Sequence, residues 1–406
     1  MAVMRRAGAG PGELYWDPFD TEIDESPYEV WRRMRDEAPV YRNDRHDFFA
    51  LSRFQDVNAA HRDTRTFLSS RGTVLELMGE DLSSQAGLII FMDPPEHDAM
   101  RALVSRAFTP RRVVSLEGRI RQICRQHLDP QVGGGGFDYL ADFGALLPSK
   151  VISALLGVPE SDRPRVLELI DTSFHIEPDV GMVNEVSLGA QIELLGYLHS
   201  QLEERRARPR DDLLTGLVQA EVAGPDGTTR RLTDEEAAGF ANLLVSAGTE
   251  TVARLLGWAA VVLAEHPDQR AELVADPSLI PGAVEELLRY EAPSPVQGRW
   301  TSREVELHGT TIPAGSKVLL LTGSAGRDER VYPDPDRFDI HRRFDQHVSF
   351  GIGPHFCLGA ALARLEAKVA LEETLARFPE WEVDHARAVR LHTSTVRGYK
   401  NVPIRL

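Results

Sequence analysis

The stretch SFGIGPHFCLGAALARLE, residues 349–366, places one of only two cysteines in the chain among glycines and directly before an Ala/Leu-rich run. Gly351, Gly353 and Gly359 free the backbone around Cys357 for tight turns and for the close approach of a bulky group. We expect a helix to begin just after Cys357, so that its amides and the positive end of its dipole favour the thiolate form. A thiolate in this position serves as a nucleophile or as a metal ligand.

The neighbourhood of Cys357 argues against an ordinary zinc site. Zinc centres use several Cys or His ligands at short spacing, and only His355 is close. A single thiolate points instead to a metal that a macrocycle already holds. The other cysteine, Cys124 in RQICRQHL, is interpreted as a small buried apolar residue.

The composition is that of an ordinary globular protein and excludes several function classes. Hydrophobic residues make up 42% of the 406 residues, which provides ample apolar material for a large core. A formal net charge of −16 argues against a nucleic-acid-binding protein, because such a protein needs a basic face. The opening MAVMRRAGAGPGELYW has no apolar segment behind its arginines, so we expect no signal peptide. The two cysteines suit a reducing cytoplasm.

Residues 241–264, ANLLVSAGTETVARLLGWAAVVLA, are long and apolar enough to mimic a membrane span. Glu250 and Arg254 lie in the middle of this stretch, where a bilayer would penalise their charges. Thr233 and Glu236 form a capping-box pattern, from which a helix can run to about residue 266. We therefore predict a helix of about 33 residues that is buried in the protein, and no membrane association.

The rest of the chain has the pattern of a mainly α protein with a minor β portion. Helical apolar spacing occurs in residues 26–39, 53–63, 95–128 (with a break at Thr109–Pro110) and 280–290. Strand-like patterns occur in residues 47–52, 303–321 and 396–406. The fold class predicted from these patterns is mainly α.

The residues around the cysteine fit the pattern F-x-x-G-x-x-x-C-x-G at Phe350, Gly353, Cys357 and Gly359. In this pattern the chain resembles the cytochrome P-450 family, most of all its soluble bacterial, actinomycete-type branch. The resemblance implies one domain over residues 17–406 after a flexible lead-in at residues 1–16. The implied fold is a triangular helical prism with a small β-rich lobe, and it holds haem b between a long central helix and the helix after the cysteine. Cys357 is then the axial ligand of the iron.

The resemblance also implies which residues surround the haem. Four polar residues are implied to hold its two propionates: His97, Arg101, Arg299 and His355. Each charge-assisted hydrogen bond of this kind contributes about 1.5–3 kcal/mol. Phe350, Gly353 and Gly359 are implied to shape the loop around the cofactor.

Glu286 and Arg289 in EELLRY lie three residues apart and share one face of a predicted helix. On a protein surface such a pair contributes little to stability. The resemblance implies instead a buried pair that supports the haem loop and is joined by an arginine of the segment PDPDRF, Arg337. Removal of one member of a buried pair costs about 3–5 kcal/mol.

The sequence AGTET, residues 247–251, lies in the middle of the long predicted helix. One interpretation makes Thr251 a structural residue whose hydroxyl bonds back to the carbonyl of Ala247 and bends the helix. The resemblance implies a catalytic role, in which Gly248 leaves room beside the iron. Glu250 and Thr251 then form an acid–alcohol pair that delivers protons for cleavage of the O–O bond.

The implied activity is that of a cytoplasmic, monomeric monooxygenase, which inserts one oxygen atom from O2 into a lipophilic small molecule of secondary metabolism. The predicted pocket residues are Leu88, Ile89, Ile90, Phe91, Phe174, Ile176, Leu243, Leu244, Ala247, Val296, Gln297, Thr395 and Val396. Because the sequence shows no flavin or nicotinamide domain, we expect electrons from a ferredoxin and its NAD(P)H-dependent reductase. Basic sites are predicted to dock that ferredoxin by electrostatic steering, at residues 101–112, 341–343, Arg364 and Lys368.

Two other functions are alternatives at the level of sequence. A haem peroxygenase would use hydrogen peroxide directly, and the Glu250–Thr251 pair argues against it. A cysteine-nucleophile hydrolase, with Cys357 activated by a histidine, would contain no haem. A visible spectrum of the pure protein separates the hydrolase from the haem enzymes.

Overall fold

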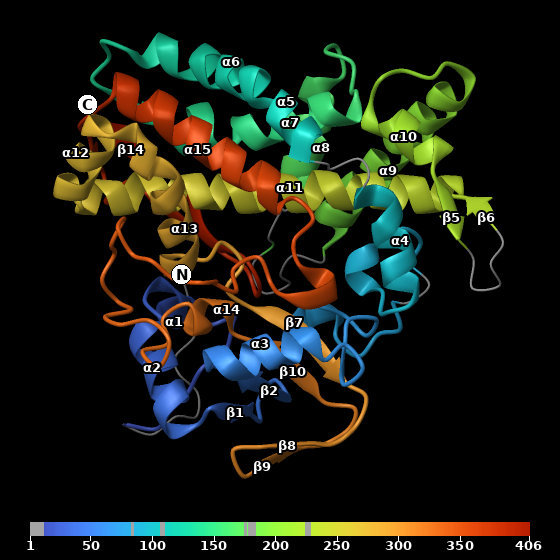
Figure 1. The fold of residues 1–406 in the computed structure, drawn as a ribbon, viewed down its shortest axis with the longest axis vertical. Coiled ribbons are helices and arrows are strands. Elements are labelled where there is room, and N and C mark those ends of the chain that lie inside the picture. The colour runs from blue at the N-terminus through green and yellow to red at the C-terminus, as the bar shows by residue number, and fades with distance from the viewer. Residues whose placement is uncertain (1–11, 83–84, 106–109, 174–176, 178–183, 224–228) are drawn as a thin grey trace.

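The computed structural model describes residues 12–82, 85–105, 110–173, 177, 184–223 and 229–406. Within these residues a large helical region and a smaller β-containing lobe lie on either side of one long helix (Figure 1). The predicted class, mainly α with a small β-rich lobe, is confirmed. Most of the predicted lead-in, residues 1–11, lies outside the described part of the chain.

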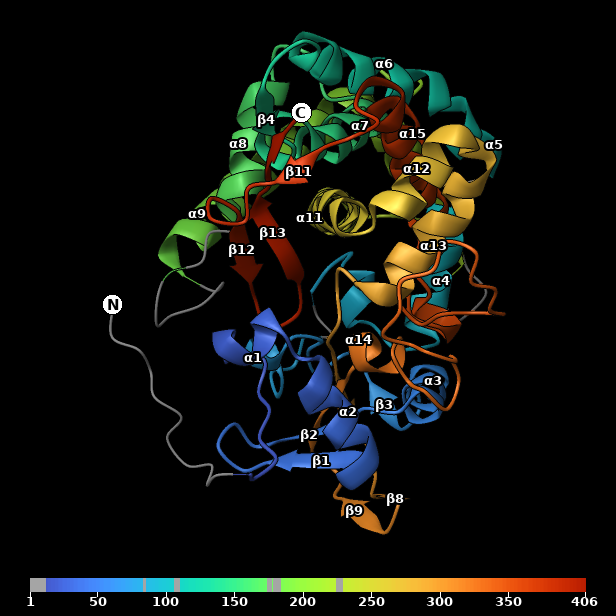
Figure 2. The ribbon, with the colours of Figure 1, turned by 90° about the vertical axis from the view of Figure 1, so that its left-hand side faces the viewer.

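Helix α11, Asp234–Glu265, passes through the centre of the molecule and is seen end-on in Figure 2. The predicted capping box sets its start, because the side chains of Thr233 and Glu236 each accept the other residue's backbone N–H. Its 32 residues agree with the predicted length. Among the described helices it is the one that is long and apolar enough to cross a membrane. However, 72% of its apolar stretch is buried inside the protein. It is therefore the core helix that the sequence predicts.

The longer helices of the large region pack around α11. Those in direct contact with it are α7 (Leu146–Leu156), α9 (Glu185–Ala207) and α15 (Ala360–Arg377). A second layer consists of α6 (Glu117–Leu128), which covers α15, and α8 (Arg163–Ser173), which covers α9. Leu194, Leu198 and Leu202 show why α9 packs inward: they are spaced four apart, form one apolar stripe and are fully buried.

The shorter helices lie in both the helical region and the β lobe. In the helical region they are α4 (Glu96–Ser105), α5 (Pro110–Ser115), α10 (Leu213–Gln219), α12 (Pro267–Ala275) and α13 (Ile280–Tyr290). In the lobe they are α1 (Thr21–Glu25), α2 (Tyr28–Glu37), α3 (Phe54–Arg62) and α14 (Thr322–Ala325). The helical pattern predicted over residues 95–128 is thus divided among α4, α5 and α6, with a second break at Leu116 that the sequence did not indicate.

The β lobe is built on a five-stranded sheet with the order β1-β2-β10-β7-β3. Its strands are β1 (Val40–Asn43), β2 (Phe48–Leu51), β3 (Phe67–Leu68), β7 (Gln297–Thr301) and β10 (Lys317–Leu320). Only the β2–β10 pair is parallel among these neighbours. Because side chains alternate along a strand, Gln297 and Arg299 of β7 share one face, and both border the cavity described below.

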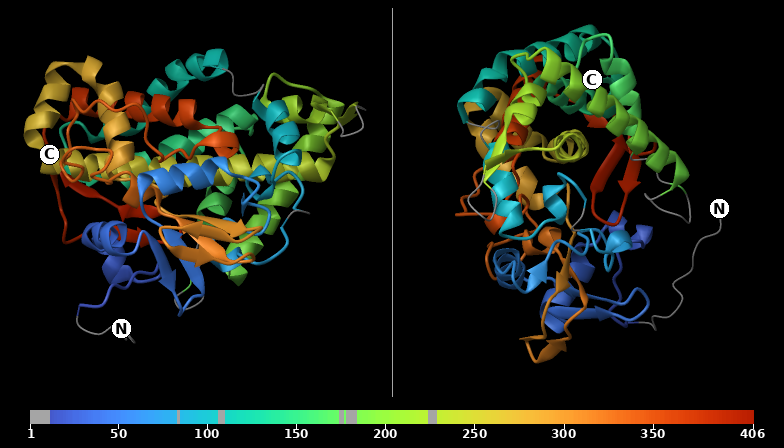
Figure 3. Two further views of the ribbon diagram at one scale, coloured as in Figure 1. Left: turned by 60° about the horizontal axis from the view of Figure 1, so that its bottom comes forward. Right: turned by 90° about the vertical axis from the view of Figure 1, so that its right-hand side faces the viewer.

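Smaller sheets complete the fold. Strands β11 (Glu382–Val383), β14 (Pro403–Arg405) and β4 (Gly136–Asp138) form one sheet. The two-stranded sheets are β12 (Val389–His392) with β13 (Arg397–Asn401), β5 (Glu221–Ala223) with β6 (Thr229–Arg231), and β8 (Val305–Leu307) with β9 (Thr310–Ile312). Strand β13 packs on α11, so the turn between β12 and β13 is held near the middle of that helix. Figure 3 shows the five-stranded sheet on one side of α11 and the outer helices on the other.

Candidate functional site

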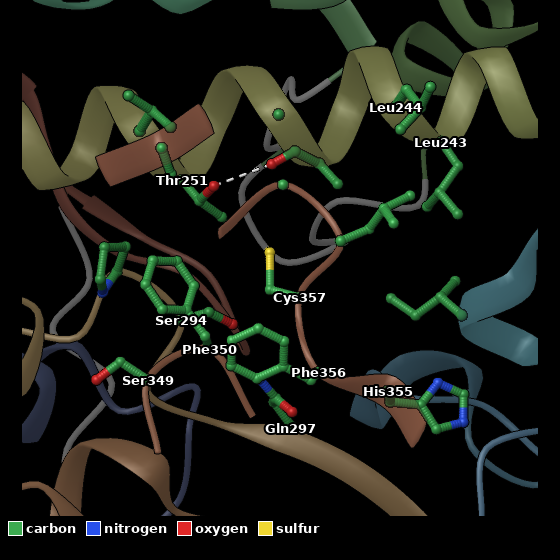
Figure 4. A pocket seen from close by; sticks show the side chains of 18 of the residues that line it. Leu243, Leu244, Thr251, Ser294, Gln297, Ser349, Phe350, His355, Phe356 and Cys357 are labelled. Carbon is green, nitrogen blue, oxygen red and sulfur yellow. Dashed lines mark hydrogen bonds between the residues drawn. The ribbon is translucent and has the colours of Figure 1, made fainter. Parts of the chain in front are cut away.

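A cavity of about 400 Å³ lies between α11, the loop before α15, β7 and the β12–β13 turn (Figure 4). This volume is in the range of small-molecule binding sites. Its lining is mainly apolar. Cys357 lies at the wall opposite α11, and its sulfur points toward that helix (Figure 4). The cysteine singled out by the sequence therefore faces a cavity.

The loop around Cys357 has the tight backbone that its glycines predict. The amide of Cys357 donates a hydrogen bond to the carbonyl oxygen of Phe350 at 2.9 Å. Gly351 and Gly353 have φ angles of 66° and 76°, which favour glycine. A Cβ at Gly353 would also lie 3.0 Å from the carbonyl oxygen of His61. These two glycines are therefore required by the turn itself.

Opposing effects act on the pKa of the Cys357 thiol. Burial raises the pKa of its thiol, whereas the backbone N–H of Gly359 and the guanidinium of Arg101 lower it. The start of the helix thus acts in the predicted direction, but burial outweighs it. This balance speaks against an activated cysteine nucleophile. A metal cation on the sulfur is the kind of group that would stabilise the thiolate.

The four residues predicted to hold carboxylates are brought together at the cavity wall: His97, Arg101, Arg299 and His355. The rings of His97 and His355 lie 4.1 Å apart, and Nε2 of the buried His97 has no partner among the described residues. Arg299 is buried and donates to the carbonyl of Gly298 at 2.7 Å, and burial lowers its pKa to about 10. Arg101 donates to the carbonyl of Phe356 at 2.5 Å.

This set of groups fits the propionates of a haem. Arg101 and Arg299 supply guanidinium charge, and the unpartnered nitrogen of His97 supplies a further hydrogen-bonding group. Burial, reinforced by Arg299, lowers the pKa of His355 to about 2, so His355 acts as a neutral hydrogen-bonding group. Buried polar atoms are normally satisfied, and carboxylates are the natural partners of arginine.

His61 is a polar residue beside this cradle that the sequence did not reveal. It lies on α3, is 1% exposed, and neither ring nitrogen has a partner among the described residues. Burial, with a smaller effect of Arg299, lowers its pKa to about 3, so the ring is neutral. No motif marks His61, because it occupies an ordinary inward position of an amphipathic helix.

Gly248 and Thr251 of α11 face the cavity, as predicted. The hydroxyl of Thr251 donates to the carbonyl oxygen of Ala247 at 2.9 Å, which is the bond expected of a structural threonine (Figure 4). The same side chain borders the cavity, so its position is compatible with both the structural and the catalytic interpretation of Thr251. A Cβ at Gly248 would meet only Ile152, at 3.8 Å. Packing among the described residues therefore does not require glycine at 248.

Glu250 does not line the cavity. Its carboxylate pairs with Arg254 at 2.8 Å, and both side chains are largely buried. Arg254 also donates to the carbonyl of Tyr399 on β13. A role of Glu250 in proton delivery therefore requires its carboxylate to leave this pair or to act through water.

Glu286 and Arg289 of α13 form the predicted buried pair, with two hydrogen bonds of 2.7 Å and side-chain exposures of 1% and 0%. Arg289 also donates to carbonyl oxygens of the loop that leads to the cysteine, those of residues 326, 335 and 337. The pair thus fastens that loop to α13.

The prediction that the side chain of Arg337 completes this pair is wrong. That side chain is 67% exposed and bonds Asp339 at 2.9 Å. Arg342 takes its place, donating to Glu286 at 3.1 Å and to the carbonyls of residues 333, 334 and 337. The physical reason is that Arg337 turns its carbonyl oxygen, not its side chain, toward the pair, because this carbonyl accepts hydrogen bonds from Arg289 and Arg342.

Most predicted pocket residues line the cavity: Ile89, Ile90, Leu243, Leu244, Ala247, Val296, Gln297, Thr395 and Val396. Leu88 and Phe91 do not, so the prediction is wrong for them. The short 3₁₀ turn Ile89–Phe91 explains this, because residues three apart share one side of such a turn, and here that side faces away from the cavity. Phe174 and Ile176 lie outside the described residues.

The structure adds lining residues that sequence reasoning missed, among them Thr73, Val74, Phe240, Ser294 and Glu366. The signal for Phe240 was present, because it lies three and four residues before Leu243 and Leu244 on one helix. Glu366 ends the stretch that marks the cysteine, at helical spacing from the lining residue Leu362. Thr73 and Ser294 come from irregular segments, in which periodicity does not predict side-chain direction.

A second hollow lies on the other side of the cysteine loop, bordered by Phe356, Arg62, Arg343 and Arg364. Phe356 is 39% exposed. Of the predicted basic docking sites, Arg364 pairs with Glu285 at 2.6 Å and Lys368 approaches Glu372 at 3.5 Å. Arg342 is held inside the loop, and the side chains of residues 106–112 are outside the description. Among the described side chains of these sites, the charges of Arg364 and Lys368 are thus compensated in part by neighbouring acids.

Comparison with known proteins agrees with this site. The family model described as Cytochrome P450 matches residues 193–400. "Putative cytochrome P450 123" of Mycobacterium tuberculosis is 43% identical over 397 residues, which cover 97% of this chain and 98% of that protein. Erythromycin C-12 hydroxylase of Saccharopolyspora erythraea is 40% identical over 378 residues, with 91% and 92% covered. The structure of cytochrome P450 CYP109Q5 from Chondromyces apiculatus superposes with a TM-score of 0.87 at 39% identity, covering 96% of this chain and 97% of that one.

Proposed function

The chain belongs to the cytochrome P450 family, and from this premise we propose that Cys357 is the thiolate ligand of its haem iron. The protein is a haem-thiolate monooxygenase, which inserts one oxygen atom of O2 into an organic substrate while the other leaves as water. The observation that carries the assignment of Cys357 is its sulfur, which faces Thr251 across a cavity that Gly248, Arg101 and Arg299 also line.

Other residues of the chain would hold haem b in this cavity. Arg101 and Arg299 would bind its carboxylates, with His97 and His355 as further hydrogen-bonding groups. Phe350, Gly353 and Gly359 would give the cysteine loop its shape. When bound, the haem supplies the iron at which O2 is reduced. The protein supplies the thiolate, the binding groups and a largely apolar site.

Thr251 and Glu250 would take part in proton transfer during the reaction. The hydroxyl of Thr251 donates to Ala247 at 2.9 Å, which leaves its oxygen free to accept a hydrogen bond from water in the cavity. Glu250 would move protons from outside the cavity once it separates from Arg254. Gly248 would keep the wall of α11 open for O2. The proposed catalytic set is therefore Gly248, Glu250 and Thr251.

The substrate we infer is a neutral, lipophilic molecule with polar groups along one edge. One wall consists of apolar residues of α11 and of the 3₁₀ turn Ile89–Phe91, namely Ile89, Ile90, Phe240, Leu243, Leu244 and Ala247. The other carries uncharged polar residues, namely Thr73, Ser294, Gln297 and Thr395. Charged lining residues in the described part of the chain are at the propionate cradle and at Glu366. A natural product that this enzyme tailors has this character, and likeness to an erythromycin hydroxylase supports it.

The electrons would come from separate proteins, because bacterial members of the family generally use redox partners. We propose a ferredoxin and its NAD(P)H-dependent reductase, with docking at the hollow around Phe356 and Arg364. We further propose that the enzyme is a cytoplasmic monomer and that residues 17–406 form one domain. The burial of α11 supports a soluble protein.

The test of Cys357 is the spectrum of the reduced carbon monoxide complex. Cys357→Ser should abolish the red-shifted Soret band of a thiolate-ligated haem, whereas Cys124→Ser should keep it. Cys124 is a matched control because burial raises its pKa to about 12 and makes it inert. Loss of the band in Cys124→Ser and its retention in Cys357→Ser would overturn the assignment. Absence of haem from the wild-type protein would favour a hydrolase, and turnover with hydrogen peroxide alone would favour a peroxygenase.

A further inference from the structure

Asp98 is an acid beside the propionate cradle to which the proposed function gives no role. It lies in the first turn of α4, and its side chain is 60% exposed. Its Oδ1 atom lies 2.9 Å from Nδ1 of His97, whose side chain is fully buried. The other ring nitrogen of His97, Nε2, has no partner among the described residues, and His97 borders the cavity. One buried ring thus connects an exposed carboxylate to the wall of the cavity.

The hydrogen bond to Asp98 decides which nitrogen of His97 carries a proton. A carboxylate can only accept a hydrogen bond, so Nδ1 of His97 is the donor. In a neutral ring Nε2 then has a lone pair and no hydrogen. Such a nitrogen cannot donate to a haem propionate, which is itself an acceptor. His97 can therefore bind a propionate through Nε2 only as an imidazolium, which has an N–H at both nitrogens.

The groups around His97 favour the neutral ring as long as no carboxylate is bound at Nε2. Burial lowers the pKa of His97, and the hydrogen bond and charge of Asp98 oppose this effect. Arg101 lowers the pKa slightly and Asp93 raises it slightly. A second carboxylate, placed at Nε2, would add a negative charge and shift this balance toward the cation. The other titratable or charged described groups near these residues are Arg299 of β7, His355 of the cysteine loop and His61 of α3.

His355 is the neighbour that competes with His97 for a proton. The two rings lie 4.1 Å apart, and two imidazolium cations at this distance would repel each other. Nε2 of His355 lies 3.3 Å from the hydroxyl oxygen of Ser69, which is an uncharged partner. Burial lowers the pKa of His355 to about 2, and Arg299 and His97 lower it as well. Asp98 therefore selects His97 as the ring that gains the proton.

We propose that Asp98 is a positioning residue that makes His97 a cationic donor to one haem propionate, an inference that rests on the proposed haem-thiolate function. As the carboxylate binds, Nε2 of His97 takes up one proton from solvent and forms an N–H bond. The N–H at Nδ1 stays bonded to Asp98, and no electron is transferred. The imidazolium is then hydrogen-bonded to two carboxylates. Binding of the cofactor thus adds a positive charge to the cradle, besides those of Arg101 and Arg299.

The direct test is nitrogen NMR of the holoenzyme labelled at its histidines, in the reduced carbon monoxide form, which is diamagnetic. The nitrogen shifts distinguish a ring nitrogen with a proton from one with a lone pair. At neutral pH the wild type should show a ring with protons at both nitrogens, and His97→Gln should remove that signal. A His97 ring whose Nε2 has a lone pair in the wild-type holoenzyme would overturn the proposal.

A second measurement tests Asp98 through the reduction potential of the haem. A positive charge close to the iron favours the reduced form, so the potential should fall as the pH rises and His97 loses its proton. Because the carboxylate of Asp98 is 60% exposed, Asp98→Asn should move this fall to lower pH by about one pH unit, the low end of what a neighbouring charge does. An unchanged pH profile in Asp98→Asn would refute the positioning role.

Glu96→Gln is the matched control, because Glu96 is the other acid in the first turn of α4 and is also exposed. Both acids favour the start of the helix, so a general effect on α4 should appear in both variants. Equal displacement of the pH profile in Glu96→Gln and Asp98→Asn would overturn the proposal. Asp98→Glu restores a carboxylate and should return the profile toward that of the wild type.

The carbon monoxide spectrum separates failure of this inference from failure of the proposed function. Absence of haem from the wild-type protein would count against the haem-thiolate function itself. A wild type with an intact thiolate-ligated spectrum and a neutral His97 would count against the role of Asp98 alone. If His97→Gln does not incorporate haem, the pH profiles of Asp98→Asn and Glu96→Gln still decide, because both variants keep the histidine.

Discussion

Substitution of Arg342 and of Arg337 should have very different effects on stability. The side chain of Arg342 is 9% exposed and donates to Glu286 at 3.1 Å and to three loop carbonyls. Hydrogen bonds that involve a charged group contribute about 1.5–3 kcal/mol. Arg337 is 67% exposed and bonds only Asp339 among the described ion pairs, so its removal should cost at most about 0.5 kcal/mol.

Removal of the acid at the centre of this network should cost more. In Glu286→Gln the buried guanidinium of Arg289 loses its carboxylate, and a stranded buried charge costs about 3–5 kcal/mol. With an unfolding entropy of about 2.1 cal/mol/K per residue, 406 residues give about 0.85 kcal/mol/K. The expected fall in Tm is then about 4–6 °C for Glu286→Gln, about 2–4 °C for Arg342→Gln and less than about 1 °C for Arg337→Gln.

The assay is thermal unfolding of the holoenzyme, followed both by circular dichroism and by the haem absorbance. Because the network fastens the cysteine loop, the haem signal should be lost at or before the loss of helix in Glu286→Gln and Arg342→Gln. Equal shifts for Arg337→Gln and Arg342→Gln would refute the geometry of this loop. A shift below about 1 °C for Glu286→Gln would show that the buried pair does not support the fold.

Thr251→Ala should leave haem incorporation and substrate binding nearly intact while electrons leak into peroxide, and full coupling of product to NADPH would contradict the catalytic role. Arg364→Glu combined with Arg112→Glu should slow ferredoxin-driven turnover, most of all at low salt, and unchanged kinetics across salt concentrations would refute the docking face. Burial opposes ionisation of Glu285, but hydrogen bonds from Arg364 and His347 lower its pKa from 4.5 to about 2. Its stabilising effect is therefore complete above pH 4.5 and is lost as the pH falls toward 2, so urea unfolding of Glu285→Gln should depend less on pH in this interval, and an unchanged dependence would contradict the pairing.

Short sequence patterns were sufficient to predict the features that are determined by residues close together in the chain. The capping box at Thr233 set the start of α11, and the glycines around Cys357 gave the tight loop. The spacing of Glu286 and Arg289 placed both on one face of α13. In each case the decisive interaction joins residues within a few positions of one another, so its geometry follows from the helix or turn that contains it.

Features set by contacts between distant segments were not predictable in this way. Arg337 and Arg342 are both near the cysteine in sequence, and only the path of the folded chain shows which of their side chains reaches Glu286. Leu88 and Phe91 have the same apolar character as Ile89 and Ile90, but the 3₁₀ turn gives them another direction. The order of the five-stranded sheet, in which β7 lies between β10 and β3, likewise has no local signature.

Glu250 and Glu366 illustrate the contrast between local sequence patterns and contacts of distant segments. Glu250 stands out in the sequence because it adjoins Thr251, yet adjacent positions on a helix point in different directions, and its carboxylate meets Arg254 instead of the cavity. Glu366 has no such neighbour, and its burial depends on how α15 packs against α11. The same burial leaves its Oε2 atom without a hydrogen-bond partner among the described residues and raises the pKa of its carboxyl to about 8, so no motif in the sequence reveals what is unusual about this acid.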